Sequence, residues 1–259
     1  MQHGISLLSH IPCRAEPSDK SEMVSQLLFG ELYFVTEVQE KWVQIRIAHD
    51  HYTCWVCIKQ VHLITEELFS DLEADLPVYC TELVQIVQSN EALLPITLGA
   101  TLFNLKGDEL TLGDKKFIYQ GATSDKFAAL TKSKIIEDAF MYIGAPYLWG
   151  GRSPFGIDCS GFTQIVYKMN GLALPRDASQ QVEIGENYSF VEEAEPGDLA
   201  FFDNEEGNIT HVGILLQDGK IIHASGKVRI DKLDHHGIFN EETGKYTHKL
   251  RIIKNIIPK

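Results

Sequence analysis

One cysteine and two histidines stand out as residues that can do chemistry together. Cys159 lies in "GIDCSGF", His211 opens "HVGILLQ" and His223 lies in "IIHAS". A thiol attacks a carbonyl carbon as its thiolate, and a neighbouring imidazole can take up the proton. A third polar group must then fix the tautomer and the orientation of that imidazole. The three residues predict nucleophilic catalysis, with His211 as the base and His223 as the orienting group.

The residues after Cys159 predict a helix that begins at the thiol. The segment "SGFTQIVYKMNG" has a helical apolar face and a typical helix exit, formed by Phe162, Ile165, Val166, Met169 and the pair Asn170-Gly171. Cys159 is expected at or just before the first turn, where free backbone N–H groups and the helix dipole favour a thiolate. The small residues Ser160 and Gly161 leave room for a carbonyl, and the Cys159 N–H can serve an oxyanion.

Three strands are expected to carry the histidines. They are "DLAFFD", "HVGILLQ" and "KIIHASG", and Asp218-Gly219 predicts a hairpin between the last two. A two-residue turn at this pair would place His211 and His223 on opposite faces of the sheet. We therefore expect a bulge, a longer loop or a strand-end position for one of them. A helix followed by an antiparallel sheet is an α+β pattern.

The chain divides into three predicted domains, 1–66, 67–128 and 129–259. Short β-type runs such as "ELYFVTEV" and "WVQIRIA" predict a small β-barrel in the first, and a similar style predicts a second β module. In "WVQIRIA" the alternation places Val43, Ile45 and Ile47 on one face. The third domain opens with "TKSKIIEDAFMYIG", a predicted helix that ends at Gly144 and has Ile135, Ile136, Ala139, Phe140 and Ile143 on its apolar face.

Each of these residue types also has a simpler interpretation. A single cysteine is more often a small buried hydrophobe than a nucleophile, and a strand histidine is more often structural or exposed. We place His235, His236 and His248 in that structural or exposed class. The pair in "CWVC" is interpreted as structural, because neither a helix start nor a second cysteine pair accompanies it.

Composition excludes some partners. The 259-residue chain has a formal net charge of −13, which argues against a nucleic-acid partner. No window is long and apolar enough for a membrane span, and the first residues lack a signal-peptide pattern. With five cysteines, an odd number without a dense framework, we expect a cytoplasmic protein. A secreted or periplasmic protein whose leader was removed is the alternative.

The chemistry-bearing segments resemble a known family when they are taken in order. "PYLWGGRSPFGIDCSGF", "PRDASQ", "PGDLAFF", "HVGILL" and "IIHAS" are similar to the NlpC/p60 superfamily of papain-like cysteine peptidases. The resemblance implies that Cys159 is the nucleophile, His211 the general base and His223 the third polar member. It also implies that the Tyr147 hydroxyl helps to stabilise the oxyanion. No metal or organic cofactor is implied.

The first domain resembles a bacterial SH3 domain in "FGELYFVTEVQEKWVQIRI" and "HYTCWVCIKQVHLI". The implied fold class is multidomain, with two small all-β SH3-like barrels followed by an α+β papain-like catalytic domain. This arrangement is similar to the subgroup that trims free murein peptides during cell-wall recycling. The resemblance implies cleavage between γ-D-glutamate and a diamino acid, with release of L-Ala-γ-D-Glu from peptides whose L-Ala is unblocked.

Such a substrate needs a carboxylate to meet its α-ammonium, because an unpaired buried charge is strongly unfavourable. The resemblance nominates Asp158 and Asp177, with Trp149 and Ser160 lining the pocket and Glu31 and Tyr52 closing it. Asp158 can also be a helix N-terminal acid that the dipole favours, a role compatible with binding, whereas Asp177 could as easily cap the next turn. Arg152 and Arg176 are left outside the site, since an exposed arginine is more often solvating.

Three other functions stay open. The chain could be a secreted endopeptidase that cuts intact wall, with the SH3-like modules as anchors. It could be a catalytically silent protein that binds wall peptides. It could also be an amidase or acyltransferase that uses the same thiol on another acyl group. Oligomeric state and the identity of the diamino acid are not predicted.

Overall fold

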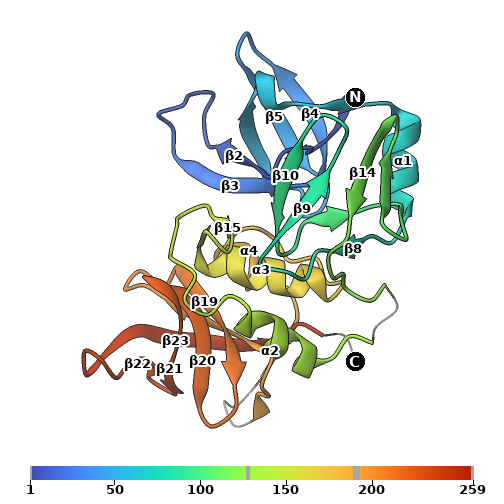
Figure 1. The fold of residues 1–259 in the computed structure, drawn as a ribbon. Coiled ribbons are helices and arrows are strands. Elements are labelled where there is room, and N and C mark those ends of the chain that lie inside the picture. The colour runs from blue at the N-terminus through green and yellow to red at the C-terminus, as the bar shows by residue number, and fades with distance from the viewer. Residues whose placement is uncertain (1, 127–128, 189–192, 258–259) are drawn as a thin grey trace. The chain divides into compact units, whose positions relative to one another are not determined.

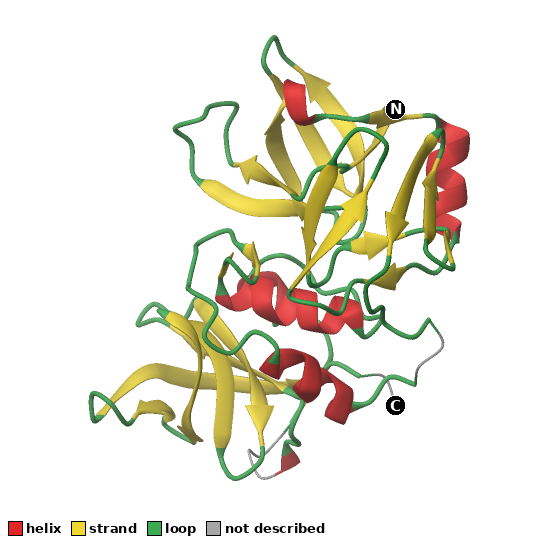
Figure 2. Ribbon diagram, in the orientation of Figure 1, coloured by secondary structure: helices red, strands yellow, loops and turns green. Residues whose placement is uncertain are grey.

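The computed structural model describes residues 2–126, 129–188 and 193–257, and it divides into two compact units. Unit 1 comprises residues 1–128 together with 149–154, and unit 2 comprises 129–148 together with 155–259. Both are mostly β with few helices (Figure 2). None of the helices among the described residues is long and apolar enough to cross a membrane.

The first half of unit 1 is an antiparallel sheet in the order β3-β2-β6-β5-β4-β1-β7 (Figure 1). Its strands are β1 (Gln2–Ile5), β2 (His10–Arg14), β3 (Met23–Leu28), β4 (Leu32–Val38), β5 (Trp42–Ile47), β6 (Thr53–Cys57) and β7 (Leu63–Ile64), with a 3-10 turn η1 at Ile58–Gln60. Along β5, Val43, Ile45 and Ile47 are buried and alternate with half-buried residues, which confirms the predicted alternation.

The second half of unit 1 begins with α1 (Glu66–Ala74), whose N-cap Thr65 accepts a hydrogen bond from the Leu68 N–H. A five-stranded sheet follows in the order β10-β9-β14-β13-β12. The strands of this half are β8 (Val78–Tyr79), β9 (Val84–Gln88), β10 (Leu93–Thr97), β11 (Thr101–Leu102), β12 (Leu105–Lys106), β13 (Glu109–Leu112) and β14 (Lys115–Tyr119). One continuous core joins both halves, because Ile5 and Phe29 pack in the same cluster as Phe69 and Val87.

Residues 149–154, which carry β15 (Arg152–Ser153), also belong to unit 1. Arg152 is fully buried there, and both terminal guanidinium nitrogens bond the Glu31 carboxylate at 2.8 and 2.9 Å. The Gln26 side-chain oxygen accepts the Arg152 backbone N–H at 2.8 Å. A buried bidentate ion pair therefore fixes this segment, and the interpretation of Arg152 as a solvating surface residue is wrong.

Unit 2 opens with α2 (Lys132–Phe140), which is shorter than predicted. The chain tightens after Phe140, since the Met141, Tyr142 and Ile143 N–H groups bond carbonyls three residues back. Tyr142 is consequently buried, whereas Phe140 and Ile143 are 46% and 47% exposed. The predicted apolar face is therefore wrong at these two positions.

The remaining helices of unit 2 are α3 (Cys159–Met169) and α4 (Ala178–Gln181). The strands are β16 (Gly156–Ile157), β17 (Glu186–Asn187), β18 (Leu199–Asp203), β19 (Ile209–Leu216), β20 (Lys220–Ser225), β21 (Lys227–Asp234), β22 (Gly237–Asn240) and β23 (Lys245–Asn255). The helix after Cys159 and the three predicted strands β18, β19 and β20 are confirmed.

The last six strands close on themselves. They follow the order β23-β18-β19-β20-β21-β22, and β22 pairs again with β23 (orange and red in Figure 1). Apolar side chains fill the interior of this barrel, among them Phe202, Leu215 and Ile221. Because cross-strand partners face the same side, His211, which pairs with Phe202, also points into the barrel.

Candidate active site

Cys159 is the first residue of α3, as predicted. The preceding residue, Asp158, is the N-cap, and its Oδ1 accepts the Gly161 N–H at 2.7 Å. Burial is the main reason that the pKa of the Cys159 thiol is raised to about 12, and the Asp158 charge adds to it. Hydrogen bonds from the backbone N–H groups of Val212 and Ser160 oppose this shift. The isolated thiol is therefore protonated at neutral pH, and it lies beside the strand that carries His211.

A buried arginine neutralises the cap. Arg176 is 1% exposed; its terminal nitrogens donate to both Asp158 oxygens, and one of them also donates to Ser160 Oγ at 2.9 Å. The guanidinium also lowers the pKa of the Cys159 thiol, although less than burial raises it. The interpretation of Arg176 as a solvating residue is wrong, because it fastens the residues on both sides of the thiol.

A chain of hydrogen bonds leads inward from His211. His211 Nε2 and His223 Nδ1 are 2.8 Å apart, and His223 Nε2 is 3.0 Å from Asp231 Oδ2. An ionised carboxylate only accepts hydrogen bonds, so the proton belongs on His223 Nε2. His223 Nδ1 then accepts from His211 Nε2–H, which leaves the lone pair of His211 on Nδ1. This lone pair is what a base needs.

Burial keeps the pKa of His211 well below its usual value, and the charges of His248 and His223 lower it further. The Asp231 carboxyl shows the opposite balance. Burial raises its pKa, but hydrogen bonds from His223 and Arg229 outweigh burial and lower it overall. The relay therefore starts at His211, an imidazole that burial keeps neutral, and ends on the anionic Asp231.

The hairpin between β19 and β20 explains why the two histidines share a face. Leu216 pairs with Lys220, so the loop contains Gln217, Asp218 and Gly219. One residue more than a two-residue turn shifts the register by one and brings His223 to the face of His211. The expected longer loop is confirmed. Gly213 lies opposite His223, and a Cβ at this position would be 2.8 Å from His223 Cβ.

His248 completes a cluster of three imidazoles. Its ring stacks on His211 with centroids 4.1 Å apart and planes 24° apart, and its Nδ1 is 2.9 Å from Thr247 Oγ1. Burial lowers the pKa of His248 to about 4. A structural or exposed role is the expectation from the sequence for this histidine, and in the structure it covers one face of His211.

Within the described residues, His211, His223 and His248 form a group whose ligand nitrogens lie within 4.8 Å of one another. A metal ion binds in the plane of each imidazole. The nearly parallel rings of His211 and His248 direct their lone pairs past one another rather than to one point. The arrangement suits stacking and hydrogen bonding.

Tyr147 lies close to the thiol. Its backbone N–H bonds the Gly226 carbonyl at 2.9 Å, and it forms a bridge with Ile157 just before the cap of α3. Burial raises the pKa of Tyr147 to about 12, and the charges of Cys159 and Asp158 contribute to the shift. The hydroxyl is therefore a neutral donor at physiological pH.

Other predicted site residues have identified partners. Asp177 is the N-cap of α4, and its backbone N–H bonds the Gln180 side-chain oxygen at 3.2 Å. Glu31, Tyr52 and Trp149 belong to unit 1. There Glu31 binds Arg152, Tyr52 packs on the core of the first sheet, and the Trp149 indole N–H donates to Glu22. Their substrate-binding roles stay predictions.

Asp231 is the site residue that the sequence analysis missed. It lies on β21 in "KVRIDKLD", a charged and apolar alternation that indicates a strand without marking one aspartate. Gly226 is the sequence signal that could have identified Asp231. This glycine makes the tight turn between β20 and β21, and the turn fixes the register in which His223 pairs with Arg229. Asp231 then follows on the same face.

Comparisons with known proteins agree with this geometry. The NlpC/P60 family matches residues 144–247, and the bacterial dipeptidyl-peptidase SH3 domain matches residues 13–61. The chain is 30% identical over 226 residues to the gamma-D-glutamyl-L-lysine dipeptidyl-peptidase of Bacillus subtilis, covering 77% of this chain and 71% of that protein. It is 25% identical over 263 residues to dipeptidyl-peptidase 6 of Lysinibacillus sphaericus, covering 88% and 91%.

The fold has a solved counterpart. The crystal structure of an NlpC/P60 family protein from Bacillus cereus superposes over 100% of both chains, with a TM-score of 0.84 at 22% identity. A fold that sets a helix N-terminal cysteine beside a strand histidine, together with these matches, defines a cysteine peptidase. The chain belongs to the NlpC/P60 family, and it carries a bacterial SH3 domain.

Proposed function

We propose that this peptidase hydrolyses the bond between γ-D-glutamate and a diamino acid in murein peptides. We further propose that it releases L-Ala-γ-D-Glu from free peptides with an unblocked amino terminus, inside the cell during wall recycling. The names of the Bacillus and Lysinibacillus relatives and the match to a dipeptidyl-peptidase SH3 domain support this choice. The observation that carries the chemistry is the unbroken relay from His211 to Asp231 beside the buried thiol.

In the proposed mechanism the resting pair is neutral, because burial disfavours both the thiolate and the imidazolium. As substrate binds, Cys159 Sγ attacks the γ-carbonyl carbon while its proton moves to His211 Nδ1. The backbone N–H of Cys159 and the Tyr147 hydroxyl donate to the oxyanion. His211 returns the proton to the leaving amine, and a water activated by His211 then hydrolyses the thioester.

Recognition of the amino terminus is proposed for Asp158, Ser160, Asp177 and Trp149, with Glu31 and Tyr52 from the SH3 unit. Asp158 already binds Arg176, so an incoming ammonium has to share this carboxylate. We also propose that residues 67–128 form a second SH3-like module and that residues 129–259 have a papain-like arrangement. The antiparallel second sheet and the cysteine at the start of α3 support these two assignments.

The test is mass spectrometry of three substrates incubated with the protein. They are L-Ala-γ-D-Glu-L-Lys, its N-acetylated form and intact peptidoglycan. We expect release of L-Ala-γ-D-Glu from the unblocked peptide alone. Cys159→Ala should abolish release, whereas Cys57→Ala, which alters another free thiol, should not. Equal turnover of the acetylated peptide would contradict the dipeptidyl specificity, and cleavage of intact wall would favour a secreted endopeptidase.

A further inference from the structure

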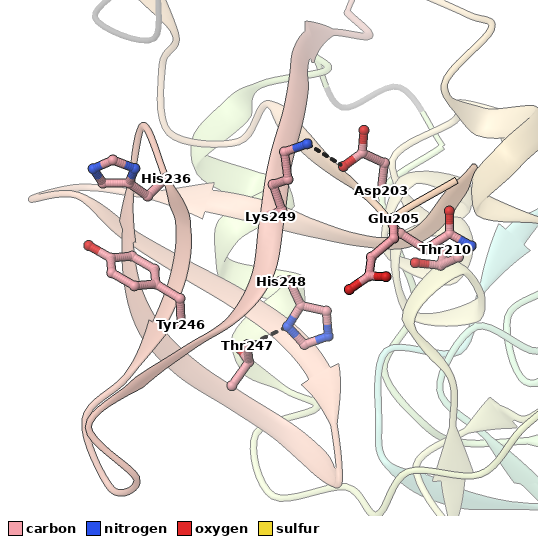
Figure 3. Close-up of a pocket in the computed structure, with 9 residues that line it drawn as sticks. Asp203, Glu205, Thr210, His236, Tyr246, Thr247, His248 and Lys249 are labelled. Carbon is pink, nitrogen blue, oxygen red and sulfur yellow. Dashed lines mark hydrogen bonds and ion pairs between the residues drawn. The ribbon is translucent and has the colours of Figure 1, made fainter. Parts of the chain in front are cut away.

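A hollow of about 930 Å³ opens beside the three-imidazole cluster, and the proposed mechanism does not use it. It is formed by the end of β18, the loop that follows, the start of β19, the turn between β21 and β22 and the first half of β23. Its lining residues are Asp203, Asn204, Glu205, Thr210, His236, Tyr246, Thr247, His248 and Lys249 (Figure 3). We call it the β18–β23 pocket.

His248 connects this pocket to the chemistry. One face of its ring covers His211, and the side chain also lines the pocket. The residue released by acyl transfer receives its proton from His211, so its nitrogen lies against this imidazole. The β18–β23 pocket therefore begins at the ring that stacks on the imidazole which protonates the leaving nitrogen.

The pocket has an incompletely satisfied carboxylate. The Asp203 side chain is 3% exposed, and Oδ1 has no hydrogen-bond partner among the residues that the structure describes. Lys249 Nζ and Arg251 Nε are each 3.9 Å from one Asp203 oxygen, too far for a hydrogen bond. A buried carboxylate with an unused acceptor is unfavourable unless a donor reaches it.

Lys249 and Arg251, the two neighbouring cations, do not donate a hydrogen bond to Asp203. The Lys249 and Arg251 side chains are 75% and 64% exposed, so water competes for both. Figure 3 shows Lys249 directed toward Asp203, with Glu205 nearby as a second carboxylate. A compact ammonium on a flexible alkyl chain can enter the pocket, approach the Asp203 carboxylate and face Glu205.

We propose that the β18–β23 pocket binds the side-chain ammonium of the diamino acid that the peptidase releases, with Asp203 as its main partner. This inference deepens the proposed function and rests on it. In this proposal Asp203 and Glu205, at and just after the end of β18, determine the specificity for a cationic leaving residue. Lysine and diaminopimelate share the chemistry that the pocket recognises.

The experiment compares kcat/KM for L-Ala-γ-D-Glu-L-Lys with that for the same peptide ending in L-norleucine, which lacks only the ammonium. For the wild type we expect a preference for lysine of roughly tenfold to a hundredfold, the range of a charged hydrogen bond. Asp203→Asn should remove most of this preference. The matched control Glu206→Gln changes an exposed neighbour that does not line the pocket, and it should keep the preference.

A third peptide that ends in meso-diaminopimelate distinguishes the two sources of the ammonium. Both cationic peptides should exceed norleucine, and the faster one identifies the preferred leaving residue. Should Asp203→Asn fail to fold, as judged by circular dichroism, Glu205→Gln replaces it with a smaller expected loss of preference.

Two results would overturn the inference and leave the proposed function intact. One is equal cleavage of the lysine and norleucine peptides by the wild type. The other is an unchanged lysine preference in the folded Asp203 variant or, where that variant does not fold, in Glu205→Gln. Cleavage of none of the three peptides would overturn the inference and the proposed function together.

Discussion

The thiol side and the imidazole side of the site each bury one carboxylate, and they use it differently. Asp158 caps α3 next to Cys159, and its charge is matched by the bidentate Arg176. Asp231 ends the row formed by His211 and His223, and it also accepts from Arg229 at 2.9 Å. The first carboxylate fixes a backbone position, whereas the second fixes where protons reside.

The two carboxylates are therefore expected to contribute to different properties, Asp158 to stability and Asp231 to the catalytic rate. Loss of the Asp158–Arg176 pair should mainly lower the free energy of unfolding, since a buried charge would lose its partner. Loss of the Asp231 charge should mainly lower the rate, since the side chain is replaced by one of equal size but different hydrogen bonding. The comparison can be tested on each side independently.

The largest effect is expected for Asp231→Asn. An amide can donate to His223 Nε2, which would reverse both tautomers and place the proton of His211 on Nδ1. We expect kcat to fall roughly 10²- to 10³-fold with little change in thermal stability. Asp234→Asn on the same strand, where the carboxylate binds the exposed Tyr246 hydroxyl, is the control and should be nearly silent. A kcat within threefold of wild type would refute the tautomer argument.

Arg176→Gln tests the thiol side. We expect the free energy of unfolding, measured by urea titration, to fall by about 3 kcal/mol because Asp158 loses its guanidinium partner. Alkylation of Cys159 by iodoacetamide should also slow, since the cation that lowers the pKa of this thiol is gone. Lys116→Gln removes an exposed pair with Glu109 and should leave the free energy of unfolding nearly unchanged. Equal decreases in the free energy of unfolding for the two variants would contradict the stabilising role of Arg176.

The pH dependence of stability tests the stacked rings. The pKa of His248 is about 4 in the folded chain and about 6.5 when unfolded, so the unfolded chain binds the extra proton. Stability is therefore fully present above pH 6.5 and is lost as pH falls toward 4. We expect a loss of about 2 kcal/mol across this window. His248→Phe keeps an aromatic ring over His211 and should flatten the curve; an unchanged slope would contradict the assignment.

The smallest effect is expected at the outer end of the relay. Glu242, 68% exposed, binds Arg229, which in turn binds Asp231. Glu242→Gln should change kcat less than twofold and stability by at most about 0.5 kcal/mol, because water screens this pair. A drop in kcat as large as that of Asp231→Asn would show that the orientation of Arg229 is part of the relay.

Local patterns predicted the elements that carry the chemistry better than the contacts between them. The helix after Cys159 and strands β18, β19 and β20 follow from apolar periodicity and from turn residues such as Asn170 and Asp218. His248 could not be placed in this way. It reaches His211 only because β23 pairs with β18 and β22 to close the barrel, and such long-range pairing leaves no local mark in the sequence.

The partners of the two buried arginines could not be predicted from local sequence patterns either. Arg152 and Arg176 follow turn-rich motifs, and nothing in those motifs states that a carboxylate distant in sequence will neutralise them. The misplaced apolar face of α2 has a local cause instead. The tightened turn after Phe140 rotates Tyr142 inward, where its ring meets Phe162 edge-on at 5.8 Å.

The loop between β19 and β20 makes the site sensitive to chain length in an unusual way. Surface turns commonly tolerate insertions and deletions. Here the parity of the loop decides which face His223 occupies, so removing a single residue such as Gln217 would turn this side chain out of the barrel. Removing or adding one residue at this exposed turn is therefore expected to abolish activity, although every residue of the relay is retained. Removing two residues would restore the parity, so related chains should vary here in steps of two.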